Sequence, residues 1–232
     1  MTGLMFQDRS HAGRNLAAII ARQKLSNPVV IALPRGAVPV AIEVATALDA
    51  PVDTLMVRKL RAPADRKVSI GAIAADGSTV FNDDLVSDLA GVEGPELDQL
   101  VSSVHATLGD LSQRYRDKHE PLSLRNRDVL VVADGMTSGG SMHAAVNLLR
   151  QQSPTRIVVA VPTTSKYAEQ RLLEVADDVI CFDMPDAFLA VGCYYLNFEP
   201  VSHDEACRQL ADYRRASDFR ANALDASTAI IP

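Results

Sequence analysis

The sequence predicts an α/β fold in which a mostly parallel, twisted sheet is flanked by helices on both faces. Three uninterrupted apolar runs are typical of strands buried on both faces, and they lie at 28–34, 128–134 and 156–164. Each run is followed by a segment with helical spacing of apolar residues, at 37–50, 141–151 and 165–176. Strands that alternate with helices along a chain favour a parallel sheet covered by helices.

The first third of the chain adds three further elements to this pattern. Residues 11–24 have apolar side chains at helical spacing and predict a helix before the first strand. Residues 52–60, "VDTLMVRKL", predict one more strand. Residues 68–81 predict a hairpin, because Asp-Gly between two apolar runs favours a tight turn.

The middle of the chain and the region after 178 are less regular. Residues 83–119 are polar with spaced leucines, which indicates a long helical insertion made of one helix or two shorter ones. Residues 178–184, "DVICFDM", predict the last strand of the alternating pattern. Residues 190–198, "AVGCYYLNF", are compatible with a further strand.

The C-terminal part of the chain contains one more helical segment. Residues 202–216 predict a helix that begins after Ser202 as its N-cap. Residues 217–232 have no periodicity and predict a mobile tail or an arm on a partner subunit. We therefore assign 1–216 to one domain and 217–232 to a C-terminal tail.

Composition excludes several classes of protein. The net charge is −6, which disfavours nucleic acid as the main partner because phosphate backbones attract basic surfaces. The apolar runs are too short to cross a bilayer, so we expect no membrane partner. The N-terminus has no secretion signal, and Cys181, Cys193 and Cys207 match no metal spacing. These features indicate a cytoplasmic protein with reduced thiols.

The stretch "VLVVADGMTSGGSM" at 129–142 holds the main candidate site. A turn of small residues between a buried strand and a helix presents backbone N–H groups and the helix dipole to an anion. The residues of this turn are Thr137, Ser138, Gly139, Gly140 and Ser141. Asp134, at the start of the turn, can accept hydrogen bonds from sugar hydroxyls. The turn therefore suits a ribose 5-phosphate, and the alternative is an ordinary strand-to-helix connection.

This stretch resembles the phosphoribosyl pyrophosphate (PRPP) motif of type I phosphoribosyltransferases. Further stretches are similar, in chain order, to a bacterial branch of that family with no assigned substrate: "FQDRSHAGRNLA", "VVIALPRGAVPVAIEVA", "VRKLRAP", "SIGAIA", "RIVVAVPTT" and "AVGCYYLNF". The resemblance covers roughly residues 6 to 212. It implies an α/β core with a small hood over the site, Asp134 on the ribose hydroxyls, and residues 137–141 on the 5-phosphate.

The same resemblance assigns a pyrophosphate site. "LPRGA" is similar to the family's pyrophosphate loop, which implies roles for Arg35 and Gly36 and a cis bond between Pro34 and Arg35. Arg58 and Lys59 end an apolar strand, and cations there stabilise the charge that builds on a departing pyrophosphate. We expect Asp134, Arg58 and Lys59 to be the residues that support transfer.

Several positions depart from the family pattern. Ala133 stands where the family has an acidic residue, and losing a hydrogen bond to a charged group costs about 1.5–3 kcal/mol. Ala37 and Arg61 replace usual glycines, and Ser138 replaces a usual Thr. Thr137 stands where purine-using relatives commonly have an acidic residue. The aromatic residues that could stack on a base or lie in the core are Phe188, Tyr194, Tyr195 and Phe198.

Two functions are compatible with these observations. The first is an enzyme that transfers the 5-phosphoribosyl group from PRPP to a nitrogenous acceptor, with Mg²⁺ bound together with PRPP rather than by side chains alone. The second is a regulator that binds PRPP or a nucleotide and has lost efficient transfer, as Ala133 suggests. The resemblance further implies small-molecule substrates and a homodimer, and it does not identify the acceptor base.

Overall fold

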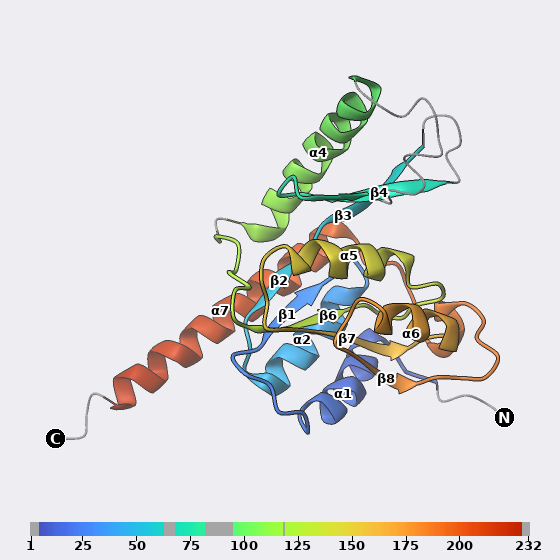
Figure 1. The fold of residues 1–232 in the computed structure, drawn as a ribbon. Coiled ribbons are helices and arrows are strands. Elements are labelled where there is room, and N and C mark those ends of the chain that lie inside the picture. The colour runs from blue at the N-terminus through green and yellow to red at the C-terminus, as the bar shows by residue number, and fades with distance from the viewer. Residues whose placement is uncertain (1–4, 63–67, 82–94, 118, 229–232) are drawn as a thin grey trace.

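The computed structural model of the protein describes residues 5–62, 68–81, 95–117 and 119–228. Its core is a five-stranded sheet with the strand order β2-β1-β6-β7-β8 (Figure 1). The strands are β1 Val29–Ala32, β2 Val52–Thr54, β6 Asp128–Val132, β7 Arg156–Thr163 and β8 Asp178–Asp183. Every neighbouring pair is parallel, which confirms the predicted fold class.

Helices cover both faces of this sheet, as the apolar runs predict. The face below the sheet in Figure 1 is covered by α1 Arg9–Ile20 and α2 Ala37–Leu48, and the face above it by α5 Gly140–Arg150 and α6 Lys166–Leu173. Alternate residues of β6 divide between two apolar clusters. Leu130 and Val132 pack with α1 and α2, whereas Val129 and Val131 pack with α5 and α6.

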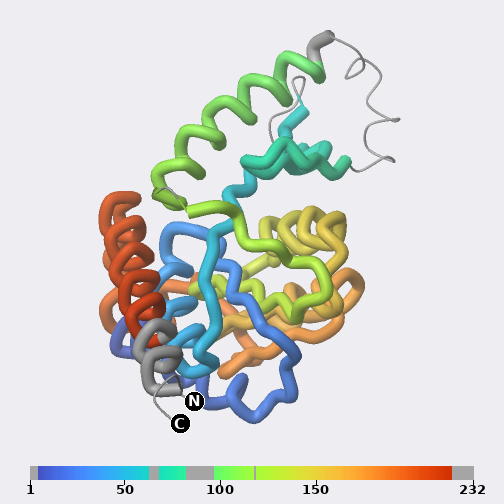
Figure 2. Tube along the Cα trace, turned by 90° about the vertical axis from the view of Figure 1, so that its left-hand side faces the viewer, coloured from blue at the N-terminus to red at the C-terminus, as the bar shows by residue number. Residues whose placement is uncertain are grey.

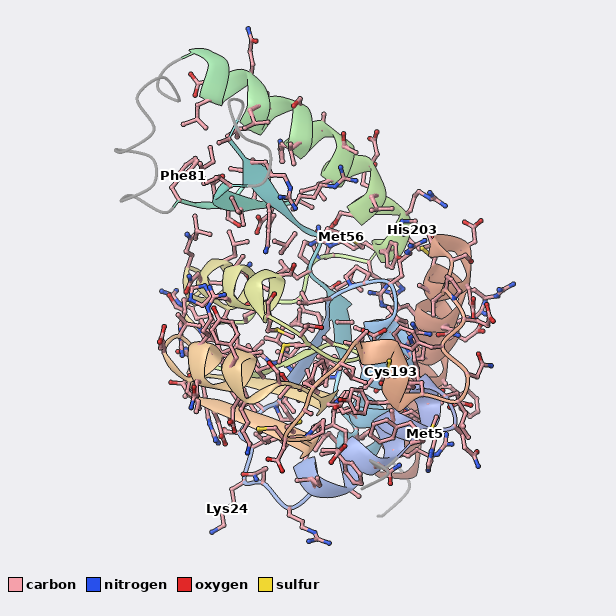
Figure 3. All side chains as sticks on the ribbon, turned by 90° about the vertical axis from the view of Figure 1, so that its right-hand side faces the viewer. Met5, Lys24, Met56, Phe81, Cys193 and His203 are labelled. Carbon is pink, nitrogen blue, oxygen red and sulfur yellow. The ribbon has the colours of Figure 1, made fainter. Side chains whose placement is uncertain are left out.

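The predicted strand at 52–60 is wrong, because the chain changes sheet within it. After β2 ends at Thr54, the chain leaves the core, and β3 Val57–Arg61 begins a second, three-stranded antiparallel sheet. Met56 is buried at the junction, where Figure 3 labels it between the core and the projecting sheet. A continuous apolar run does not mark this bend, because residues on both sides of it are buried.

The second sheet contains the predicted hairpin. It is formed by β4 Ser69–Ala74 and β5 Thr79–Phe81, and Gly77 adopts a φ of +87° in the turn between them. Helix α4 Pro95–Arg116 packs on this sheet, with Leu60, Ile73 and Leu108 in one apolar cluster. Figure 2 shows the sheet and α4 projecting together from the core. Residues 95–116 thus form one helix, and the start of the segment predicted at 83–119 lies outside the described residues.

The predicted strand at 190–198 is also wrong. Val191–Tyr194 form a short 3-10 helix, η1, and an isolated parallel bridge joins Tyr195 to Phe6. Tyr194 and Tyr195 are buried against Phe6 in a small aromatic cluster. Backbone hydrogen bonds join Phe6 to the Tyr194 carbonyl and Leu196 to the Phe6 carbonyl, both at 2.8 Å, so the pairing with the N-terminal segment is short and the rings pack beside it.

The last helix, α7 His203–Thr228, continues well past the predicted end at 216. Ser202 acts as predicted at its start, since its Oγ accepts a hydrogen bond of 3.1 Å from the Glu205 amide. Arg214 Nη1 donates to the carbonyls of Tyr115 and Arg116 at 2.8 and 3.2 Å, which joins α7 to the end of α4. Residues 217–228 are therefore helical, and the division placed at 216 falls inside a helix.

Within the described ranges, none of the helices combines the length and the apolar character that crossing a membrane requires.

Candidate functional site

Two loops meet at the carboxyl ends of β1 and β6, where parallel sheets commonly bind ligands. The loop after β1 contains a cis peptide bond between Pro34 and Arg35, and Gly36 caps α2. A Cβ atom on Gly36 would lie 2.1 Å from Oδ2 of Asp134, which follows β6. The structure thus brings the loop predicted for pyrophosphate against the acid predicted for the ribose, and only glycine fits at the point of contact.

Asp134 forms an ion pair that the sequence did not reveal. Arg9 Nε lies 2.9 Å from Asp134 Oδ2, and Arg9 Nη1 donates to the Glu199 carbonyl at 2.7 Å. The guanidinium also lies 3.9 Å from the centre of the Phe198 ring. Arg9 is 9 % exposed, so it is nearly buried, whereas the Asp134 side chain is 22 % exposed. Arg9 therefore fixes one carboxylate oxygen of Asp134, and no hydrogen bond to the other oxygen is formed by a described residue.

A second contact holds the backbone of Asp134. The Tyr195 hydroxyl donates to the Asp134 carbonyl at 2.5 Å. Burial, and then the nearby charge of Asp134, raise the pKa of Tyr195, so the phenol stays protonated and remains a donor. Tyr194 and Tyr195 therefore belong to the core, as does Phe188, which stacks on Tyr194 at 5.0 Å.

The loop predicted for the 5-phosphate has free backbone donors. Gly139 caps α5 with a φ of +67°, and no side chain caps this helix. The Thr137 carbonyl accepts from Ser165 Oγ at 2.7 Å, and the Ser138 carbonyl accepts from Arg171 at 3.4 Å. None of the amides from Thr137 to Ser141 donates a hydrogen bond to another described residue. Free amides at a helix N-terminus, beside carbonyls that are already held by the α6 region, are an arrangement that can accept an anion.

Lys59 lies over this loop. Its Nζ is 2.7 Å from the position that a Cβ on Gly140 would occupy, so the ammonium sits directly on the loop backbone. Arg58 is exposed, and side chains alternate along β3, so Arg58 points to the other face of the hairpin. The structure therefore brings Lys59, but not Arg58, to the 137–141 loop.

Arg35 and Ala133 are the remaining positions that the sequence singled out, and neither lies at the 137–141 loop. Arg35 is exposed in the loop after β1. Burial and then the charge of Arg35 lower the pKa of His203 at the start of α7, so the guanidinium lies near this imidazole. Ala133 packs against the apolar cluster beneath α5 and α6. Asp134 is thus the carboxylate that β6 presents at this end of the sheet.

Comparison with known proteins identifies the family. Residues 6–198 match the sequence model of the phosphoribosyl transferase domain family. The chain belongs to this family. Proteins from two Mycobacterium tuberculosis strains, CDC 1551 / Oshkosh and H37Rv, are named as phosphoribosyl transferases and are each 38 % identical over 228 residues. These matches cover 96 % of this chain and 50 % of each relative, so the chain spans about half the length of these curated relatives.

A solved structure has a similar fold over most of its length. The TT1426 protein of Thermus thermophilus superimposes with a TM-score of 0.82 and is 36 % identical. The match covers 90 % of this chain and 99 % of that protein. The family resemblance predicted from the motifs is therefore confirmed, and so is the fold class.

Proposed function

We propose that the protein binds PRPP and transfers its 5-phosphoribosyl group to a nitrogenous acceptor, with release of pyrophosphate. The observation that carries this proposal is the loop of free amides at the start of α5, with Lys59 above it and Asp134 at its beginning. Amides that can donate hydrogen bonds to a phosphate lie at one end of the loop, and a fixed carboxylate lies at the other. These groups match the phosphate and the hydroxyls of a ribose 5-phosphate.

In this proposal, the amides of residues 137–141 hold the 5-phosphate, and the free oxygen of Asp134 accepts from a ribose hydroxyl. The bond between C1 of the ribose and pyrophosphate breaks, and the electron pair leaves on the pyrophosphate oxygen. A bond from C1 to the acceptor nitrogen forms, and that nitrogen loses its proton. Arg35 and Gly36 would bind the leaving group, because preorganised cations and amides stabilise developing charge. Lys59 would add its charge at the 5-phosphate loop, whereas Arg58 points to the other face of the hairpin.

Mg²⁺ would enter this site with its substrate. In the described part of the chain, no group of three or more His, Cys, Asp or Glu side chains is arranged to hold a metal ion. Mg²⁺ usually keeps several waters and binds through one or two carboxylates plus substrate phosphates, so a single acid such as Asp134 fits this mode. Bound Mg²⁺ would neutralise charge on the pyrophosphate.

A second function is a regulator that binds PRPP or a nucleotide without efficient transfer, and Ala133 favours it. The family's first acid is absent at this position, and Arg9 neutralises the acid that follows. The site would then hold the ribose less strongly than two carboxylates with Mg²⁺ would. A cytoplasmic location and a homodimer remain predictions under either function.

One experiment distinguishes the two functions. The protein is incubated with PRPP, Mg²⁺ and a panel of purines, pyrimidines and other nitrogen heterocycles, and pyrophosphate release is measured, with Asp134→Asn as the inactive control. Release with one acceptor that depends on Asp134 supports the transferase. Tight PRPP binding without release from any acceptor supports the regulator, and no PRPP binding at all contradicts both.

A further inference from the structure

A cavity of about 500 Å³ lies beside the 137–141 loop, between the projecting hairpin and helix α5. Its volume is within the range of sites that bind small molecules. Figure 3 shows Phe81, one of its wall residues, at the end of the hairpin above α5 and α6. The cavity opens onto the loop itself, since Ser138 and Gly140 line it.

The cavity is cationic in a chain of net charge −6. Lys59, Arg171 and His143 line it, and its described lining includes no Asp or Glu side chain. Ser69 and Asn147 add neutral polar groups to the same lining. A cavity whose described lining has basic side chains and no acidic ones favours a ligand with more than one negative charge.

The basic groups come from three elements that enclose the side of α5. Lys59 reaches from β3 to Gly140, and Arg171 reaches from α6 to the Ser138 carbonyl at 3.4 Å. His143 lies one turn into α5, with its Nδ1 3.4 Å from Asn147 Nδ2. Two cations and an imidazole therefore surround the space directly next to the backbone amides of the loop.

The electrostatic surroundings of His143 agree with this arrangement. Burial and then the charge of Arg171 lower the pKa of His143, while Glu174 on the far side of Arg171's helix acts in the opposite direction. An anion bound between His143 and Arg171 would offset the effect of Arg171 and favour protonation of His143. The two groups are thus arranged to bind a shared anion.

A 5-monophosphate does not use this cavity, because its phosphate binds to the loop amides and its ribose lies toward Asp134. We propose that the cavity binds the second and third phosphates of nucleoside 5′-diphosphates and 5′-triphosphates, whose first phosphate occupies the loop. Such nucleotides would compete with PRPP and inhibit the protein. This inference rests on the proposed function, because it takes the loop to be the 5-phosphate site.

The test compares the 5′-mono-, di- and triphosphates of adenosine and of uridine by calorimetry, with inorganic pyrophosphate as a separate probe. We expect di- and triphosphates to bind at least about tenfold more tightly than the monophosphate, because added charge-assisted bonds contribute that much. His143→Asn should remove most of that gain while monophosphate affinity is retained. Arg171→Gln also releases the Ser138 carbonyl, so it should weaken di- and triphosphates more than the monophosphate. Arg22→Gln, an exposed arginine beyond the end of α1, removes the same charge elsewhere and should change nothing.

The outcomes separate this inference from the function on which it rests. Equal affinity for mono-, di- and triphosphates, with PRPP still bound, overturns the inference and leaves the proposed function standing. A gain that survives both Arg171→Gln and His143→Asn, in variants that melt like the parent, also overturns it. Tight binding of pyrophosphate alone, without any gain for nucleotides, would show an independent anion site instead. Failure of PRPP and every nucleotide to bind contradicts both proposals.

Discussion

Replacement of Gly36 by alanine tests the contact between the two loops of the site. Gly36 has φ −62° and ψ −24°, a conformation open to any residue, so the effect of the change is steric. The new Cβ would lie 2.1 Å from Asp134 Oδ2 and 3.0 Å from Arg9 Nε. The carboxylate must therefore move by about 1 Å or more to reach an ordinary contact distance.

That displacement breaks the 2.9 Å ion pair between Arg9 and Asp134 and moves the oxygen that faces the ribose. Loss of a hydrogen bond to a charged group costs about 1.5–3 kcal/mol. We therefore expect the Kd for PRPP to rise by about 10- to 150-fold. Because Arg9 is nearly buried, the loss of its partner should also lower the free energy of unfolding by about 1–3 kcal/mol.

The assay is calorimetric titration with PRPP and Mg²⁺, together with denaturant unfolding. Gly109→Ala is a matched control, because a Cβ at that position in α4 meets nothing within 4 Å. It should bind PRPP like the parent and be as stable or slightly more stable, since alanine favours helices by about 1 kcal/mol over glycine. Parental PRPP affinity in Gly36→Ala would refute the reasoning, because it would mean that the Asp134 carboxylate does not bind the ribose.

Three further predictions concern binding, turnover and thiol chemistry. Asp134→Asn should nearly abolish PRPP binding in calorimetry, because the amide loses the charge and one acceptor; parental affinity would contradict the ribose assignment. Lys59→Ala should lower nucleotide product affinity together with turnover, because its ammonium lies over the loop proposed for the 5-phosphate, whereas Arg58→Ala should change both less; parental product affinity in Lys59→Ala would contradict this placement. Burial raises the pKa of the Cys181 thiol to about 12, so at pH 8 mass spectrometry should find the exposed Cys193 alkylated first and Cys181 modified only as the pH approaches 12; early modification of Cys181 would show that its burial is wrong.

The parts of the site that lie within one strand-loop-helix unit were predictable from the sequence. The 137–141 loop follows a run of apolar residues and precedes a helix, so its place at the end of β6 depends only on local order. The cis bond at Pro34 followed from the family resemblance of "LPRGA". Both features are encoded within a few neighbouring residues.

Features that depend on distant packing were not predictable in the same way. Arg9 meets Asp134 across 125 positions, and no local pattern indicates that pairing, although "FQDR" belongs to the stretches that resemble the family. The opposite directions of Arg58 and Lys59 depend on which face of the hairpin packs on α5, and a run of two basic residues does not specify this. The helix at 217–228 shows no apolar stripe, so periodicity could not reveal it.

The double attachment of Arg9 has a consequence for synthesis of the chain. Its guanidinium binds a side chain 125 positions later and a carbonyl 190 positions later. Domains form as the chain leaves the ribosome, starting from the N-terminal side, so the phosphate loop can fold while Arg9 still lacks the Glu199 carbonyl. A nascent chain that ends before residue 199 would hold a phosphate weakly and a ribose hardly at all. Growing chains therefore bind little of the ligand until residue 199 has left the ribosome.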